Sequence, residues 1–204
     1  MKIPKIMHGI WLGSRLPLKL KNYRRSWKRH HKDWDFILWT EDDIMDLENQ
    51  ALYDDAKTYA EKSDVVRLEI LKEFGGVYAD MDFSCLKNIE PLIDDADFFI
   101  VQDRKVWKEN HPKYDIPYLN NAFMGSTPGH RLIKGLVDAL PGFVEENKHH
   151  HVCFRTGPGF VSQLLKDEDI LRLENRMLRR RYAQHHYENS WKEIEPQPRP
   201  WPED

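Results

Sequence analysis

Cysteine is scarce in this sequence, long apolar runs are absent, and neither sign of charge dominates. Cys85 and Cys153 are too few for a disulfide framework and lack the spacing of a zinc site, so free thiols are expected. No apolar run approaches a membrane span, and the residues after Met1 lack the apolar core of a secretory signal. With 31 Lys and Arg against 34 Asp and Glu, the net charge of -3 offers no general attraction to nucleic acid. These absences predict a soluble, cytoplasmic protein without a membrane span or a nucleic-acid partner.

What the sequence does contain is the composition of a globular domain. Its 204 residues are 40% hydrophobic and 12% aromatic, enough for a sizeable core. Apolar patterns predict strands over residues 3–11 and 35–39, with a basic helix over 18–31 between them and a further helix after the second strand. This order is typical of a parallel sheet covered by helices, an α/β fold. We expect a single domain over residues 1–192 and a proline-rich extended tail over 193–204.

Residues 63–83 form the most informative stretch of the chain. Ser63 is expected to cap a helix that ends at Gly75, and a short buried strand over residues 77–79 follows. Asp80 and Asp82 come at the end of that strand. Carboxylates in this alternation can converge on one cation, and hard oxygen ligands suit Mg²⁺ or Mn²⁺. The sequence therefore predicts a metal site at this strand end.

Asp64 and Arg67 precede the strand and lie three residues apart on one face of the predicted helix. Their side chains can point together toward the strand end or toward a ligand. A local ion pair is the simpler alternative.

The motifs of this stretch resemble those of a known group of enzymes. Asp64-x-x-Arg67, followed by Gly-Gly-x-Tyr78-x-Asp80-x-Asp82, is similar to the D-x-D core of the sugar-binding-region glycosyltransferases. These include glycosyltransferase family 32, the fungal initiating mannosyltransferases and the glucosylating bacterial toxins. The resemblance implies a GT-A type nucleotide-sugar-binding fold, with a central, mostly parallel sheet flanked by helices. It also implies a retaining, metal-dependent transfer of a hexose from a nucleotide-diphosphate sugar to a glycan, a protein or another hydroxyl acceptor.

The same resemblance assigns roles to residues elsewhere. Ile10 and Trp11, at the end of the first strand, would lie beside the nucleotide base, with His8 near the same pocket, although core packing is the simpler role for Trp11. Asn121 would lie near the donor sugar, although a turn asparagine is an alternative. The remaining donor contacts that the resemblance implies are Tyr78, Thr156, Gly157 and Pro158, the last three opening a helix at the sugar or acceptor side.

Residues 185–191, with the pattern His-His-x-x-x-Ser-Trp, also resemble a C-terminal motif of the family. A residue of this segment would complete the metal shell, and the candidates are His185, His186 and Ser190, since imidazole suits Mn²⁺ as carboxylates do. Trp191 would close over the nucleotide. Packing of an exposed tail is the alternative.

The resemblance also implies which residues bind the metal and which bind the donor. Asp82 would hold Mn²⁺ (or Mg²⁺), with Asp80 acting through water or the ribose, while Arg67 and Asp64 hold the sugar and phosphate side. A UDP-sugar is favoured as donor because of Ile10 and Trp11. The alternatives are a GDP-mannose-dependent mannosyltransferase, a non-catalytic nucleotide-sugar-binding module, and a phosphatase of the haloacid dehalogenase type, which the mid-chain position of the aspartates fits badly.

Overall fold

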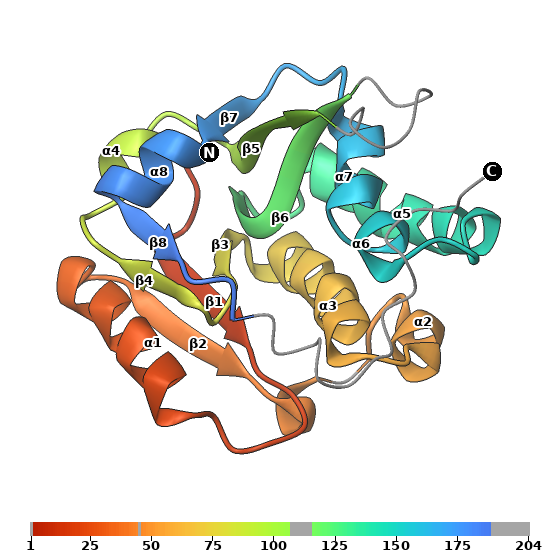
Figure 1. The fold of residues 1–204 in the computed structure, drawn as a ribbon, viewed down its shortest axis with the longest axis horizontal. Coiled ribbons are helices and arrows are strands. Elements are labelled where there is room, and N and C mark those ends of the chain that lie inside the picture. Colours follow the sequence, from red (N-terminus) through yellow and green to blue (C-terminus); the bar gives the residue numbers. More distant parts are fainter. Residues whose placement is uncertain (1, 45, 107–115, 189–204) are drawn as a thin grey trace.

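The computed structural model describes residues 2–44, 46–106 and 116–188, which fold around one central sheet (Figure 1). Six strands form this sheet, and their order from edge to edge is β2 (Asp35–Trp39), β1 (Ile6–Ile10), β3 (Gly76–Ala79), β6 (Pro117–Ser126), β5 (Phe98–Val106) and β7 (Leu171–Glu174). Strands β4 (Phe83–Cys85) and β8 (Ala183–His185) form a separate two-stranded sheet. Tail residues 193–204 lie outside the described residues.

The pairing of the strands confirms the predicted parallel opening. Strand β1 runs parallel to β2 and to β3, and β5 runs parallel to β7. Strand β6 is antiparallel to both of its neighbours, β3 and β5. The sheet is therefore mostly parallel, and its third strand, β3, ends in the aspartate pair.

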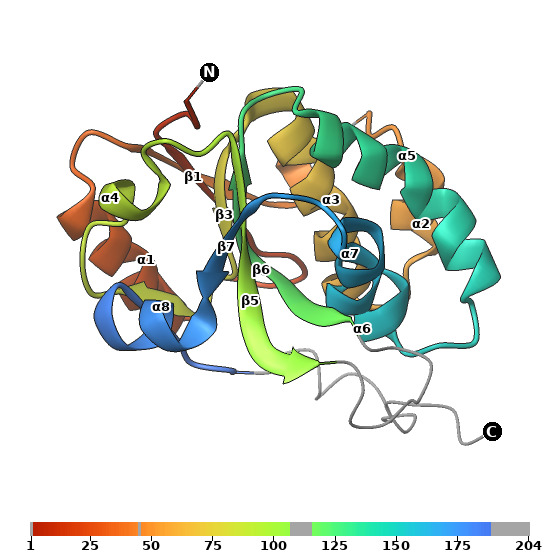
Figure 2. The ribbon, with the colours of Figure 1, turned by 90° about the horizontal axis from the view of Figure 1, so that it is seen from above.

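Helices cover both faces of the sheet (Figure 2). One face carries α2 (Gln50–Asp55), α3 (Tyr59–Phe74), α5 (Arg131–Glu146), α6 (Val152–Arg155) and α7 (Pro158–Leu165), and the other carries α1 (Leu18–His30), α4 (Glu90–Ile93) and α8 (Asn175–Arg181). A 3-10 turn, η1 (Glu41–Asp43), follows β2. Each face has its own core: Met124 packs into one and its neighbour Phe123 into the other, as alternation along a strand requires. No helix in the described part of the chain is both long and apolar enough to cross a bilayer.

Helix α3 begins earlier than the sequence pattern predicts. Its N-cap is Thr58, whose hydroxyl accepts the Glu61 N–H at 3.1 Å, while the Glu61 carboxylate accepts the Lys57 N–H at 3.0 Å. Ser63 lies inside the helix, so its prediction as the N-cap is wrong. The helix does end at Gly75, whose φ of 63° favours glycine.

Helix α5 contains Pro141 in its interior and continues to Glu146. A proline at this position leaves the carbonyl four residues earlier, that of Val137, without its helical donor. The side-chain amide of Asn49 donates to this carbonyl at 2.9 Å. A partner from a distant loop thus satisfies the backbone group that the proline leaves unpaired.

Candidate active site

Asp80 and Asp82 lie on a tight turn where β3 leaves the sheet. The Asp80 N–H donates to the Ala122 carbonyl at 2.9 Å, and the Phe83 N–H donates to the Asp80 carbonyl at 3.0 Å. This turn folds the Asp82 carboxylate back toward Asp80. One ligand atom from each aspartate and one from His185 lie within 4.8 Å of one another.

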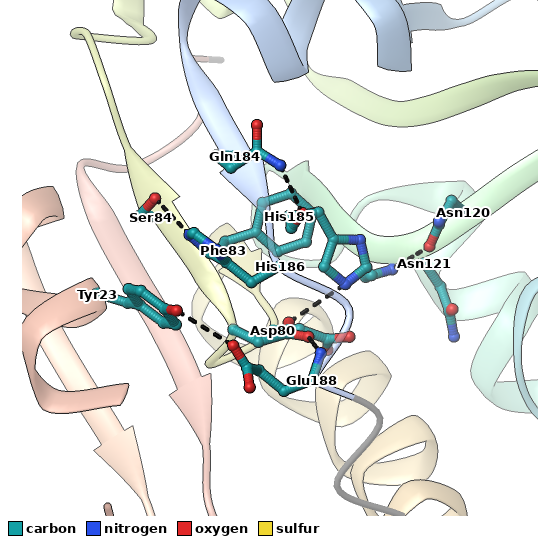
Figure 3. Close-up of polar contacts among 12 residues, drawn as sticks. Tyr23, Asp80, Phe83, Ser84, Asn120, Asn121, Gln184, His185, His186 and Glu188 are labelled. Carbon is teal, nitrogen blue, oxygen red and sulfur yellow. Dashed lines mark hydrogen bonds and ion pairs between the residues drawn. The ribbon is translucent and has the colours of Figure 1, made fainter. Parts of the chain in front are cut away.

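His185 reaches this turn through the pairing of β8 with β4. The antiparallel register places His185 opposite Phe83, and the two rings stack with centroids 4.2 Å apart. Tyr187 covers the imidazole with its own ring, with centroids 3.9 Å apart. The ring is fixed, with its Nε2 atom 3.3 Å from Asp82 Oδ1, and Figure 3 shows His185 directed toward the turn that carries Asp80.

One oxygen of Asp82 lacks a donor. Its Oδ2 accepts the Glu188 N–H at 3.0 Å, whereas its Oδ1 is buried without a hydrogen-bond partner among the described residues. Burying such an atom is costly unless something compensates it. Adjacent ligands of an octahedral ion at about 2.1 Å lie roughly 3 Å apart, close to the separation of Asp82 Oδ1 and His185 Nε2. The residues present therefore fit a divalent cation bound between Asp82 and His185.

The electrostatics of the turn also favour a cation. Burial raises the pKa of Asp80, and the Asp82 charge raises it further, against the lowering effect of Arg67. Burial acts in the same direction on Asp82, but the contact with His185 and backbone hydrogen bonds, including that from Glu188, together hold the pKa of that carboxyl below its usual value. Among the described residues, Arg67 is paired with both Asp64 and Asp80, and Asp82 adds a third carboxylate beside His185. This excess of negative charge is the environment in which a divalent ion binds.

Asp64 and Arg67 form a buried polar network behind the aspartates. The Arg67 Nη2 atom lies 3.1 Å from Asp64 Oδ1, and Arg67 Nη1 lies 3.4 Å from Asp80 Oδ1. Asn121 Nδ2 donates to Asp64 Oδ1 at 2.9 Å, and the Thr156 hydroxyl donates to Asp64 Oδ2 at 2.8 Å. Burial raises the pKa of Asp64, against the lowering effects of Arg67 and these two hydrogen bonds. The two residues do form an ion pair, but within a network that spans α3, β6 and the start of α7.

Tyr78 and Gly157 complete this network. The Tyr78 hydroxyl donates to Asp80 Oδ1 at 2.7 Å, and the Arg67 guanidinium lies 4.5 Å from the centroid of the Tyr78 ring. A Cβ atom on Gly157 would lie 3.4 Å from Asp64 Oδ2 and 3.1 Å from the Cys153 carbonyl oxygen. Gly157 thus allows the turn before α7, which begins at Pro158, to approach Asp64 closely.

Within β1, the ring of His8 is held by hydrogen bonds inside the protein. That side chain is fully buried; its Nδ1 accepts the Trp39 indole N–H at 3.1 Å, which leaves Nε2–H to donate to the Gly75 carbonyl at 2.9 Å. Burial lowers the pKa of His8 to about 4. Both ring nitrogens are engaged within the protein. Ile10 is buried in the core, while Trp11 is half-buried and donates to the Ser14 carbonyl at 2.8 Å.

The structure separates the two adjacent C-terminal histidines. His186 stacks on Tyr23 with centroids 4.1 Å apart, and its Nε2 lies 2.8 Å from the Ser84 hydroxyl. His185, rather than His186, lies beside Asp80 and Asp82. Ser190 and Trp191 lie outside the described residues.

The sequence motifs did not identify the residues that hold residues 183–188 in place. Tyr23 and Lys19 contact Glu188 from α1, a helix whose charge pattern is that of a solvated surface. No motif marks them, because their role depends on a contact between the two ends of the chain.

Several known proteins resemble this chain in sequence. Residues 17–99 match the family model described as a glycosyltransferase sugar-binding region containing a DXD motif. Inositol phosphoceramide mannosyltransferase 1 of Schizosaccharomyces pombe is 29% identical over 172 residues, which cover 79% of this chain and 50% of that protein. The uncharacterized glycosyltransferase L373 of Acanthamoeba polyphaga mimivirus is 30% identical over 164 residues, covering 76% and 61%. The chain spans about half the length of the curated mannosyltransferases that it matches.

Solved structures share the fold at low sequence identity. The PaToxG glycosyltransferase superposes with a TM-score of 0.64 at 17% identity, covering 82% of this chain and 70% of that one. The UDP-bound glycosyltransferase domain of the YGT toxin gives a TM-score of 0.52 at 11% identity, covering 85% and 79%. Residues 17–99 therefore carry the DXD-containing sugar-binding region of the glycosyltransferases, and the chain has their GT-A fold.

Proposed function

We propose that this chain is the catalytic domain of a metal-dependent glycosyltransferase, one that moves a hexose from a nucleotide-diphosphate sugar to a hydroxyl acceptor. The observation that carries the proposal is the buried Asp82 Oδ1 atom, which has no hydrogen-bond partner among the described residues and faces His185. The imidazole nitrogen lies 3.3 Å away, beyond the usual hydrogen-bond distance, whereas a site built only for stability would bring a donor closer to that oxygen. Here its neighbours are instead ligand atoms suited to a divalent ion.

Asp82 and His185 would hold Mn²⁺ or Mg²⁺, with Asp80 joining directly or through water. When bound, such an ion neutralises the charge that the leaving nucleotide diphosphate gains. Arg67, buried between Asp64 and Asp80, adds positive charge on the same side. The contacts of Asp64 with Arg67, Asn121 and Thr156 fix the direction of its carboxylate, and the one acceptor position left on Oδ2 can accept a hydroxyl of the donor sugar.

A UDP-sugar is our favoured donor. The half-buried Trp11 at the end of β1 supports base stacking, and one structural neighbour of this fold is described as UDP-bound. GDP-mannose is the second candidate, because several curated relatives are named mannosyltransferases. Three of them are named inositol phosphoceramide mannosyltransferases, so a glycolipid head group joins glycans and proteins among the proposed acceptors. Retention of anomeric configuration and a cytoplasmic location stay predictions.

Release of nucleotide diphosphate from a panel of sugar nucleotides tests this proposal. With Mn²⁺ present, we expect UDP release from a UDP-hexose to exceed GDP release from GDP-mannose. Faster release from GDP-mannose would transfer the assignment to the mannosyltransferase alternative. Binding without release would indicate a non-catalytic module, and hydrolysis of simple phosphoesters would indicate a phosphatase.

A further inference from the structure

We propose that Lys19 and Tyr23 of α1, together with His186 and Glu188, form a latch that positions His185 at the metal site. These four residues are called the latch below. The inference rests on the proposed metal-dependent function and assigns positioning residues to it. None of the four is itself a ligand of the proposed ion.

The latch joins α1 to the segment after β8 through rings and charges. The Tyr23 and His186 rings stack with centroids 4.1 Å apart and planes 5° apart. The Tyr23 hydroxyl donates to Glu188 Oε1 at 3.1 Å, and Lys19 Nζ lies 2.6 Å from the same oxygen. Figure 3 shows Tyr23 directed toward Glu188, with His186 alongside and bonded to Ser84. His186 and Glu188 are thereby held against α1, and His186 is also bonded to Ser84 of β4.

Alternation along the segment connects these anchors to the proposed metal site. Neighbouring side chains of an extended chain point to opposite sides, so anchoring His186 directs His185 away from α1. His185 accordingly lies against Asp82, at 3.3 Å. Just beyond, the Glu188 N–H donates to Asp82 Oδ2 at 3.0 Å, which leaves Oδ1 facing the imidazole. The latch therefore orients both proposed ligands, His185 through the chain and Asp82 through a backbone hydrogen bond.

The backbone of this segment needs external support. Tyr187 has a φ of 52°, a conformation that is unfavourable for a bulky side chain and persists only where its surroundings enforce it. Strands β4 and β8 pair over only three residues each, and an isolated two-stranded ladder of this size is marginal. Contacts outside the ladder must keep residues 185–188 in place. The latch supplies such contacts on both sides of Tyr187.

The ring stack and the ion pair of the latch should contribute unequally to holding residues 185–188 in place. The Lys19 side chain is 62% exposed, and an ion pair so close to water contributes little. The Tyr23–His186 stack also removes apolar ring surface from water. Tyr23→Ala should therefore have a larger effect than Lys19→Met.

The test measures Mn²⁺ binding by electron paramagnetic resonance, together with hydrogen exchange of residues 183–188 in the metal-free protein. We expect Tyr23→Ala to weaken Mn²⁺ binding about tenfold or more, as loss of residues that orient metal ligands usually does. The nitrogen coupling of the bound imidazole should weaken, and exchange of the segment should accelerate. Tyr23→Phe, which keeps the ring stack, should recover much of the affinity. Lys21→Met, which removes a charge from the same helix outside the latch, should bind like the wild type.

Each outcome decides a separate point. Tyr23→Ala with wild-type affinity and nitrogen coupling, while the wild type binds Mn²⁺, would overturn the latch alone. Unchanged exchange in Tyr23→Ala would overturn it as well. A wild type that binds no Mn²⁺ would contradict the proposed metal centre, and the positioning role with it. If Tyr23→Ala does not fold, Tyr23→Leu, which removes the ring stack and the hydroxyl but keeps a large apolar side chain, carries the same test with the same expected losses.

Discussion

At the scale of single residues, two buried histidines of this protein differ in what their ring nitrogens contact. His8 is enclosed with both nitrogens hydrogen-bonded, whereas His185 presents Nε2 to a carboxylate oxygen that has no donor among the described residues. The residue type alone does not distinguish them. Periodicity could place His8 on a strand, but the sequence carried no sign that Trp39 and Gly75 would occupy its ring.

His8 should make stability depend on pH. Its pKa of about 4 in the folded protein lies below the 6.5 of an exposed histidine, so the unfolded chain binds more protons between these values. Stability should be complete above about pH 6.5 and should fall as the pH drops toward 4, by roughly 3 kcal/mol from this residue. Urea unfolding at pH 7.5 and pH 4.5 measures this loss. His8→Gln should remove most of the difference, and an equal loss in the variant would show that other groups cause it.

At the scale of elements, local signals located most of the fold, and contacts between distant residues decided the rest. Strand β2 and the termination of α3 at Gly75 follow from neighbouring residues and were predictable. The continuation of α5 through Pro141 was not, because its support comes from Asn49, 88 residues from Val137. The choice of His185 over His186 depends on the register of β8 against β4. A slip of one residue would exchange the two side chains.

The cap of α3 gives a test at this scale, since that helix carries Asp64 and Arg67. Thr58→Ala removes the hydroxyl that accepts the Glu61 N–H and should lower the free energy of unfolding by about 1 kcal/mol. Thr58→Ser keeps the hydroxyl and should lose much less. Denaturant unfolding of both variants measures the difference. Equal losses would mean that the buried methyl group, and not the cap, stabilises this helix start.

At the scale of the whole molecule, the sheet gathers polar residues from four distant parts of the chain around one strand end. Asp80 and Asp82 follow β3, Asn121 comes from β6, and Thr156 precedes α7. The fourth part is β8, which brings His185 across from the C-terminal side. The sequence predicted the site at β3 because its spacing is local. The resemblance named Asn121 and Thr156 and offered His185, His186 and Ser190 as metal ligands, but the choice of His185 and the contacts with Asp64 depend on the sheet and its packing.

The central claim is that Asp82 holds a cation that transfer requires. The most direct measurement is the rate of nucleotide diphosphate release from a UDP-hexose, with and without Mn²⁺, in the wild type and in Asp82→Asn. We predict metal-dependent release in the wild type and a loss of at least ~3 kcal/mol of transition-state stabilisation in the variant, roughly a hundredfold or more in rate. Circular dichroism should show that the variant remains folded. Near-normal, Mn²⁺-stimulated release by Asp82→Asn would contradict the claim.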